Sequence, residues 1–383
     1  MKGAPVRVTM VIDHPAQHFT RALQILSAEP GVQLDVCYWS AAGRVHDAGF
    51  DRSVSWDVDL LRGYPWRAPE PGQPAAGRIR WLIGQLHARR PQLVICYGWA
   101  SPIARASLLY CRVARIPVVL YGDTTWQHSA RGGHRVLRAL ALRVLMRASA
   151  GAVSTGAFNR EFYISHGMDP RRIWPGICPA DTGLFGMARA GSRATPGAAP
   201  TPLRIGFAGK LIARKGVDEL LRAAARLPIA RAWSVTVVGD GPLRPELEAL
   251  AATLGLADRV TFHGFANTTE MPRLLAAFDV MVVPSRRDMR VLVTIEAMAA
   301  GAAVIVSDAT AVWGPGDLVE DGVTGLVYPS GDPDALGRQL SRLLEEPGLL
   351  ATLRRNGAAR AAEFGPDAYA RTMASAIRMC LPS

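Results

Sequence analysis

The stretch Phe207–Gly216, FAGKLIARKG, is the most informative part of this sequence. A predicted strand over 204–208 ends at Ala208, and a glycine follows that allows close approach of the backbone. A helical pattern then begins at Val217. Strand, glycine loop and helix in this order are typical of a βαβ unit, so the stretch predicts an α/β fold with a parallel sheet.

The same stretch predicts an anion site. Of the 44 basic residues only three are lysines, and two of them, Lys210 and Lys215, stand here in front of the helix. A helix N-terminus and two ammonium groups attract an anion, and the compact ammonium suits phosphate oxygens. We therefore expect a diphosphate to bind here, the alternative being two solvated lysines at a helix start.

Both halves of the chain continue this alternation of strands and helices. Strands are predicted at 6–12, 33–38, 93–97, 118–121, 151–155, 204–208, 234–238, 260–263, 280–283, 304–307 and 325–328. Helices are predicted in the first half at 17–27, 78–89, 101–115, 134–147 and 157–166, and between the strands of the second half. The pattern predicts two doubly wound, Rossmann-like domains.

A segment rich in Gly, Ala, Pro and Ser, GMARAGSRATPGAAPTP at 186–202, separates the two halves. We predict an N-terminal domain over 1–186, a linker over 187–203 and a C-terminal domain over 204–365. We also predict a C-terminal helix over 366–383. One possibility for this helix is that it crosses back to pack on the N-terminal domain. Two such domains are expected to face each other across a cleft, with functional residues in the loops that follow the strands.

Another informative stretch, residues 284–308, carries two carboxylates eight positions apart. Asp288 lies in the loop after a predicted strand, and Glu296 lies near the start of the next helix. Carboxylates at strand ends are good acceptors for vicinal sugar hydroxyls. The alternative is a surface aspartate and a helix-start glutamate that the helix dipole favours.

Composition narrows the function classes. With 383 residues, 49% of them hydrophobic and 20% charged, the chain can form two cores, and no apolar run reaches the ~18–20 residues of a membrane span. We expect no signal peptide and a cytoplasmic protein. Five scattered cysteines without a C-x-x-C pair indicate neither a disulfide framework nor a zinc site, and we expect no metal.

Of the net charge of +12, +11 resides in the first half, where residues 1–190 hold 23 basic and 12 acidic side chains. Such a surface suits an anionic membrane, a phosphorylated substrate or nucleic acid, or is a solvated arginine-rich surface. No nucleic-acid recognition motif is present, so nucleic acid is not expected as a partner. The turn VVGDGP at 237–242 does not match G-x-G-x-x-G, which argues against a nicotinamide dehydrogenase.

The second half resembles the donor domain of retaining GT-B glycosyltransferases of family 4, the bacterial glycosyl transferases group 1. The matching pieces are FAGKL-x3-KG, VVGDGPLRPELEAL, VTFHGF, FDVMVVPSRRD-x7-E, EAMAAGAAVIVSD and LVEDGVTGLVYPSGDPDAL. In the first half HPAQHF, SWDVDLLRGY and YGDTTW resemble acceptor domains of some bacterial members. The resemblance implies a GT-B fold, with acceptor binding by the N-terminal domain and nucleotide-sugar binding by the C-terminal domain.

The resemblance also implies roles for single residues. Lys210 and Lys215 would bind the donor diphosphate, Asp288 the hydroxyls of the donor sugar, and Glu296 the ribose diol. The implied donor site comprises Gly209, Lys210, Lys215, Gly264, Phe265, Asp288, Met289, Arg290, Val291 and Glu296, with Gly264 and Phe265 at the nucleobase. Lys210, Lys215, Asp288 and Asp123 are the implied catalytic group. Asp13, His14, Gln17, Trp99 and Trp126 would lie on the acceptor side.

Three positions depart from the family pattern. Lys210 stands where the family usually has arginine, Asp288 where it usually has glutamate, and Val291 where it usually has glycine. The implied reaction moves a hexose-type sugar with retention, by front-face attack assisted by the leaving phosphate, without a metal or other cofactor. UDP is the favoured donor nucleotide and GDP the alternative. A nucleotide-sugar 2-epimerase of the same fold and a non-catalytic nucleotide-binding homologue are the competing interpretations.

The acceptor stays open between a sugar, a lipid-linked molecule and a small molecule such as an aminocyclitol, in envelope glycan, glycolipid or secondary-metabolite synthesis. The segment 131–147, RGGHRVLRALALRVLMR, places arginines between leucines and could lie on an anionic membrane surface. Packing of its leucines on a sheet is the competing interpretation. Peripheral contact with the inner face of the plasma membrane is therefore one expectation, and the oligomeric state stays open.

Overall fold

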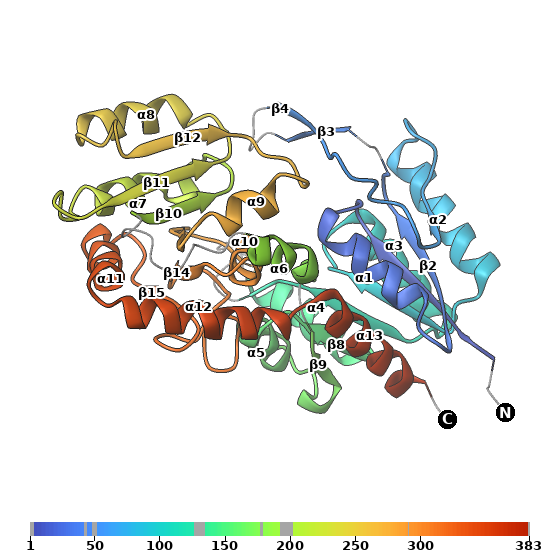
Figure 1. The fold of residues 1–383 in the computed structure, drawn as a ribbon. Coiled ribbons are helices and arrows are strands. Elements are labelled where there is room, and N and C mark those ends of the chain that lie inside the picture. The colour runs from blue at the N-terminus through green and yellow to red at the C-terminus, as the bar shows by residue number, and fades with distance from the viewer. Residues whose placement is uncertain are drawn as a thin grey trace. The chain divides into compact units, whose positions relative to one another are not determined.

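The fold is seen in a computed structural model (Figure 1), which describes residues 4–41, 44–47, 52–125, 135–176, 179–191, 202–289 and 291–381. The described residues form two compact units. The first draws on 1–43, 59–179 and 366–383, and the second on 44–58 and 180–365.

A seven-stranded parallel sheet in the order β5-β2-β1-β6-β7-β8-β9 forms the first unit. Its strands are β1 (Val6–Ile12), β2 (Val32–Tyr38), β5 (Trp66–Arg67), β6 (Leu93–Tyr97), β7 (Val118–Gly122), β8 (Gly151–Ser154) and β9 (Ile173–Pro175). Its helices are α1 (Gln17–Ser27), α2 (Ala75–Arg89), α3 (Pro102–Ala114), α4 (Arg135–Ala148), α5 (Ala157–Ser165), the 3-10 turn η2 (Pro170–Arg172) and α13 (Pro366–Cys380).

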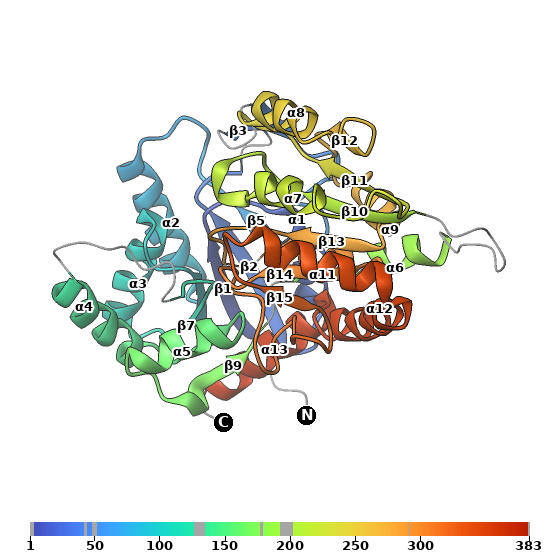
Figure 2. The same cartoon turned by 90° about the vertical axis from the view of Figure 1, so that its left-hand side faces the viewer.

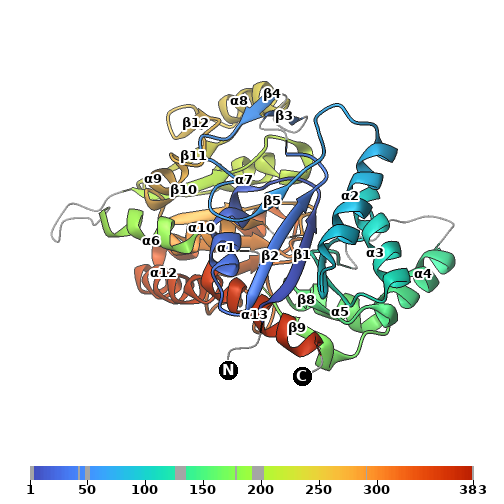
Figure 3. The ribbon, with the colours of Figure 1, turned by 90° about the vertical axis from the view of Figure 1, so that its right-hand side faces the viewer.

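The helices of the first unit cover its sheet on both faces, as Figure 3 shows for α1 and α2. Alternate side chains of β1 point to opposite faces, so Met10 packs with α1 and α13 while Val11 packs with α2, α3, α4 and α5. In α13, Tyr369 and Met373 are fully buried against the same cluster as Phe19 of α1. The C-terminal helix is therefore a structural part of the first unit.

A six-stranded parallel sheet in the order β12-β11-β10-β13-β14-β15 forms the second unit. Its strands are β10 (Leu203–Ala208), β11 (Trp233–Val238), β12 (Val260–Gly264), β13 (Val280–Val283), β14 (Ala303–Ser307) and β15 (Leu326–Tyr328). Its helices are α6 (Thr182–Gly191), the 3-10 turn η3 (Ala213–Lys215), α7 (Val217–Ala224), α8 (Arg244–Thr253), α9 (Met271–Ala276), α10 (Leu292–Ala299), α11 (Pro333–Glu345) and α12 (Pro347–Ala362).

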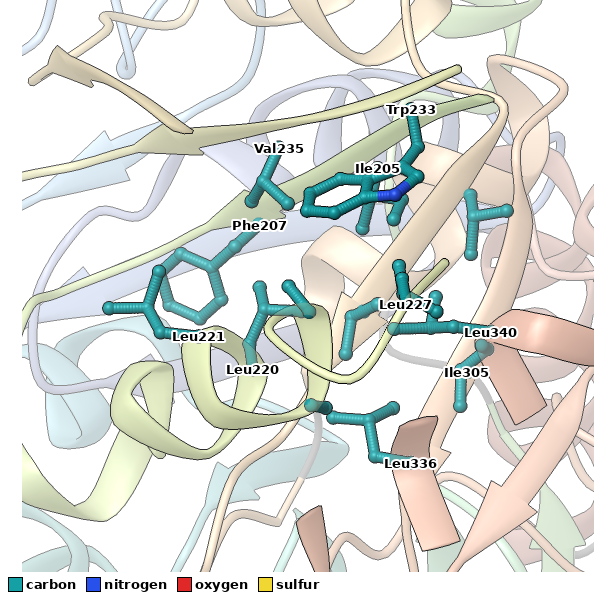
Figure 4. Close-up of a cluster of buried hydrophobic side chains, with 14 of the residues drawn as sticks. Ile205, Phe207, Leu220, Leu221, Leu227, Trp233, Val235, Ile305, Leu336 and Leu340 are labelled. Atoms are coloured by element: carbon teal, nitrogen blue, oxygen red, sulfur yellow. The ribbon is translucent and has the colours of Figure 1, made fainter. Parts of the chain in front are cut away.

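One face of this second sheet carries the core drawn in Figure 4, where Phe207 and Val235 of the strands meet Leu220 of α7 and Leu336 of α11. The other face packs against α6, α9 and α10. Phe185 of α6 is 5% exposed there. Because this side chain is buried in the core of the second unit, α6 belongs to that unit.

The domain limits differ from the predicted ones. The second unit includes the residues from Ala180 onward. The boundary predicted at 186 therefore lies inside α6. The linker predicted over 187–203 begins within α6, which ends at Gly191. The second unit also includes the antiparallel hairpin of β3 (Arg44–Asp47) and β4 (Arg52–Ser55). Next to it, Asp57 accepts hydrogen bonds from the backbone N–H (3.2 Å) and hydroxyl of Thr269.

Candidate functional site

The strand order of the second sheet places two loops at one point. β10 lies in the middle of the sheet, with β11 on one side and β13 on the other, so the chain changes direction across the sheet between β10 and β13. In open parallel sheets ligands bind outside the carboxyl ends of the strands at such a point. The loop after β10 carries Gly209, Lys210 and Lys215, and the loop after β13 carries Asp288.

Two glycines bring these loops close together. Gly216, at φ +67°, lies so near the loop after β13 that an added Cβ would be 2.0 Å from the Pro284 carbonyl oxygen. Gly239, at φ +134° in the loop after β11, would meet the Gly209 carbonyl oxygen at 1.8 Å. No other residue type fits these positions without a shift of the backbone. The two glycines thus allow the three loops of the site to pack closely against one another.

The contact that defines the site is an ion pair between Lys215 and Asp288, with 2.5 Å between Nζ and Oδ2. The side chains are 14% and 15% exposed, so solvent screens the pair only weakly. Arg214 also lies 3.2 Å from the same carboxylate oxygen. Two cations therefore converge on one carboxylate, and the cluster carries a net positive charge.

Arg286 fixes the loop that carries these cations. Its backbone N–H donates to the Arg214 carbonyl at 2.8 Å, and its guanidinium donates to the Ala213 carbonyl at 2.8 Å. The guanidinium also pairs with Asp218 at 2.6 Å. The backbone of η3 is thus held by a side chain from the opposite loop, which positions Lys215.

The structure changes the relation between two predicted residues. From the sequence, Lys215 was assigned to the diphosphate and Asp288 to the donor sugar, but the two form one ion pair across 73 positions of the chain. Arg214 and Arg286 were not among the predicted residues. The only sequence signal for them was their position next to the predicted ones, in ARKG and PSRRD.

Glu296 lies on α10, half-buried, and its carboxyl group has no ion-pair or hydrogen-bond partner among the residues that the structure describes. Burial raises the pKa of its carboxyl group to about 7, because desolvation disfavours the charged form. An unpartnered carboxylate of this kind can accept hydrogen bonds from a ligand's hydroxyl groups. Its acceptor capacity grows as the pH rises through 7.

The remaining predicted donor residues lie around this cluster or pack beneath it. The Gly264 carbonyl accepts a hydrogen bond from the Gly239 N–H at 2.7 Å, which ties the loop after β12 to the loop after β11, and the half-buried Phe265 follows. The backbone N–H of Met289 donates to Asp288 at 3.1 Å. Val291 is 6% exposed and belongs to the hydrophobic core. Arg290 lies outside the described residues.

Lys210 lies in the same loop as Lys215 and is half-buried. Its backbone carbonyl accepts a hydrogen bond from the N–H of Ile212 at 3.0 Å. The neighbouring N–H of Leu211 donates to the Asp240 carbonyl at 2.9 Å, so the loop has a fixed course between the ends of β10 and β11.

The first unit gathers its predicted residues at the carboxyl ends of three neighbouring strands. Asp13 and His14 follow β1, Trp99 follows β6 and Asp123 follows β7, and β1, β6 and β7 are adjacent in the sheet. Trp99 stacks on the ring of Phe162, with 5.8 Å between centroids and a 4° interplanar angle. Trp126 lies outside the described residues.

Two buried polar atoms lie beside that edge, at the start of α1. Gln17 Oε1 and His18 Nε2 have no hydrogen-bond partner within the described parts of the chain. Burial, and then the charge of His14, lowers the pKa of His18 to about 4, so His18 is neutral at physiological pH. His18 was not predicted, because a histidine at a helix start has no spacing that distinguishes it.

The described residues contain no group of three or more His, Cys, Asp or Glu side chains placed to hold a metal ion. Nor does any helix among them have the length and apolar character that a bilayer span requires.

Comparison with known proteins places these features in a family context. Residues 189–360 match the family Glycosyl transferases group 1. A 2-deoxystreptamine glucosyltransferase of Streptomyces kanamyceticus is 38% identical over 168 residues, which are 42% of this chain and 41% of that protein. A D-inositol 3-phosphate glycosyltransferase of Streptomyces bingchenggensis is 35% identical over 334 residues, 82% of this chain and 65% of that protein. The chain thus spans less than two thirds of the length of either relative.

Solved structures define the fold class. The Anabaena protein HepE, crystallised with UDP and with UDP-glucose, superposes with a TM-score of 0.74 in its UDP complex, at 19% identity over 97% of this chain and 100% of that one. The chain has the two-sheet α/β architecture of GT-B glycosyltransferases, which confirms the predicted fold class. Lys215, Asp288 and Glu296 all lie within residues 189–360, the part of the chain that matches the Glycosyl transferases group 1 family.

Proposed function

We propose that this chain is a bacterial, cytoplasmic glycosyltransferase of family 4 that acts with retention and without a metal. It moves a hexose-type sugar from a nucleotide diphosphate sugar to an acceptor hydroxyl, with UDP favoured over GDP as the nucleotide. The observation that carries the proposal is the cluster of Lys215, Arg214 and Asp288 at the switch point of the second sheet. It lies within the residues that match the group 1 family.

The basic residues of the cluster would act on the leaving group. As the bond between the anomeric carbon and the diphosphate oxygen breaks, negative charge grows on the phosphate, and Lys215, Lys210 and Arg214 offer preorganised positive charge there. The acceptor oxygen then bonds to the same face of the anomeric carbon, and its proton passes to the leaving phosphate oxygen. Such charge stabilisation is the largest contribution that this site offers.

The carboxylates would hold the donor in place. Glu296 has an unpartnered carboxylate, which suits the two hydroxyls of a ribose. Asp288 would accept hydrogen bonds from the donor sugar once a diphosphate competes for Lys215. We assign the acceptor to the edge of the first sheet, where Asp13, Trp99 and Asp123 follow three adjacent strands.

The names of the relatives guide the choice of substrates. HepE was solved with UDP and UDP-glucose, and one relative in Streptomyces is named for glucose transfer to 2-deoxystreptamine. These names favour UDP-glucose as the first donor to test and an aminocyclitol or a polyol phosphate as the first acceptors. A lipid-linked acceptor is the third class.

A thermal-shift titration with UDP, GDP, ADP and TDP tests the donor site, because a ligand that binds only the folded state raises the melting temperature with concentration. UDP is expected to give the largest shift. Incubation with UDP-glucose and each acceptor should then release UDP, in the presence of EDTA as well as without it, and NMR of the product should show the anomeric configuration of the donor. An epimer formed from the donor alone, or binding without release of UDP for any acceptor, would contradict the proposal.

A further inference from the structure

The positive charge of the chain is concentrated in one segment. Residues 71–160 contain thirteen arginines and a single acidic residue, Asp123, a formal net charge of +12 that equals the charge of the entire chain. The other 293 residues therefore carry 31 basic and 31 acidic side chains and are neutral as a whole. This concentration needs an explanation that the nucleotide-binding unit does not supply.

The helices of that segment lie on one face of the first sheet. It contains α2, α3, α4 and the start of α5, whose buried residues belong to one hydrophobic cluster, while α1 and α13 cover the other face. Figure 2 shows α3 and α4 next to each other, as does Figure 3. Arg105, Arg112 and Arg115 of the α3 region, and Arg138, Arg143 and Arg147 of α4, are exposed.

Helix α4 also exposes an apolar stripe, which we define as Val136, Leu137, Leu140 and Val144. These side chains are 72%, 68%, 50% and 69% exposed. At 3.6 residues per turn they lie within an arc of about 100°. Leu142 and Met146 occupy the opposite side of the helix and are buried on the sheet. The sheet therefore does not account for the leucines and valines of the stripe.

The neighbouring helix adds to this surface. Leu109 and Val113, one turn apart on α3, are 69% and 78% exposed. Six of the thirteen exposed large apolar side chains among the described residues thus lie on α3 and α4. Such side chains are normally scattered singly over a soluble protein, and a concentration of them marks an interaction surface.

We propose that the outer faces of α3 and α4 dock on a lipid bilayer that contains anionic lipids. Aliphatic side chains enter the boundary between headgroups and acyl chains, while the arginines between them extend to the phosphates. No acidic residue lies on either helix to oppose this contact. A second copy of the chain fits this surface less well, because self-association would bring two segments of charge +12 together.

This inference goes beyond the proposed function and does not depend on it, since it concerns a surface on the first unit and no residue of the donor site. If both the bilayer docking and the proposed function hold, the unit that docks on the bilayer is also the unit with Asp13, Trp99 and Asp123 at the carboxyl ends of its strands. A lipid-linked molecule would then be the favoured acceptor class.

Sedimentation of the full chain with lipid vesicles tests the surface. The chain is expected to bind vesicles of phosphatidylcholine with roughly one third phosphatidylglycerol at about 0.1 M salt, and to bind pure phosphatidylcholine at least ~10-fold more weakly. Binding to the anionic vesicles should fall as the salt concentration rises. A chain that stays in the supernatant, or binds both vesicles equally, overturns the proposal.

Two double variants locate the contact. R143Q/R147Q should bind the anionic vesicles about 25-fold more weakly, since each arginine near such a surface contributes about fivefold. L137S/L140S should weaken binding by about tenfold or more. The matched controls, R355Q/R371Q and I229S/V323S, change exposed residues outside α3 and α4 and should bind as the unmodified chain does.

All four positions of the test variants are exposed, so the melting temperature should not change, and donor binding serves as a second check of folding. If the test variants bind vesicles as strongly as their controls do, α4 is not the contact. If light scattering shows a dimer that only L137S/L140S disrupts, the stripe is a self-association surface. Either result contradicts bilayer docking.

Discussion

Replacing Asp288 by asparagine is expected to change nucleotide binding and sugar transfer in opposite directions. In the free protein the Asp288 carboxylate holds Lys215 at 2.5 Å. A phosphate oxygen that accepts a hydrogen bond from the same ammonium at about 2.8 Å would lie about 5 Å from Asp288. At an effective dielectric constant of about 20, two unit charges at that separation repel by about 3 kcal/mol.

The repulsion acts on bare UDP, which has no sugar to interact with Asp288. Salt and the 15% exposure of the side chain reduce it, so we expect Asp288→Asn to bind UDP about tenfold more tightly, a gain of about 1.4 kcal/mol. Transfer from UDP-glucose should fall, because the neutral amide accepts hydrogen bonds from sugar hydroxyls more weakly than a carboxylate does.

Isothermal titration calorimetry with UDP measures the first effect, and UDP release measures the second. Asp258→Asn is the matched control, since Asp258 is exposed and lies at the opposite end of the second sheet, just before β12. If Asp288→Asn binds UDP no more tightly than the unmodified chain while the control is neutral, a diphosphate does not compete for Lys215 and the assigned position of the phosphate is wrong.

Lys215→Ala should lower turnover by about 100-fold or more, the scale of losing one preorganised charge-stabilising group, with steady-state UDP release as the measurement and near-normal turnover as the contrary result. The preference for UDP over its 2′,3′-dideoxy analogue should grow from pH 5.5 to 8.5, as Glu296 ionises with its pKa of about 7, and Glu296→Gln should remove that pH dependence in calorimetry. Asp279→Ala removes a carboxylate that accepts four hydrogen bonds. The free energy of unfolding measured in urea should fall by about 3 kcal/mol, the lower end of the range for a buried ion pair, because its arginine partners are partly exposed. Gly216→Ala, whose Cβ would meet the Pro284 carbonyl, should weaken UDP binding by at least ~10-fold while the far-UV circular dichroism is retained.

The regular elements were well predicted wherever local sequence determines them. The strand 6–12 and the helix 17–27 have the same limits in the structure as in the prediction. A run rich in β-branched residues and an amphipathic period of 3.6 can be recognised without a distant partner. The two-residue strand β5 was not predicted. Its pairing with β2 comes from tertiary contact, which a pattern of two residues cannot encode.

The contact between the two charged residues of the candidate donor site could not be predicted from the sequence. A sequence read along its length shows Lys215 and Asp288 as two motifs with separate roles, and only the strand order between β10 and β13 brings them together. The close approach of Gly216 to Pro284 is equally invisible, since a glycine in a loop has many uses. The limit between the two units was predicted from composition alone. In the structure that limit lies before α6, because Phe185 of this helix is buried in the second unit.

The position of α13 affects the order in which the two units can fold during synthesis. The first sheet needs Tyr369, Met373 and Ile377 to complete the cluster on the α1 face, and these residues leave the ribosome after all of the second unit. The second unit needs only residues up to 365. The part of the chain that is made first is therefore the last to be completed, and during that interval an uncovered apolar sheet face is available to chaperones and proteases.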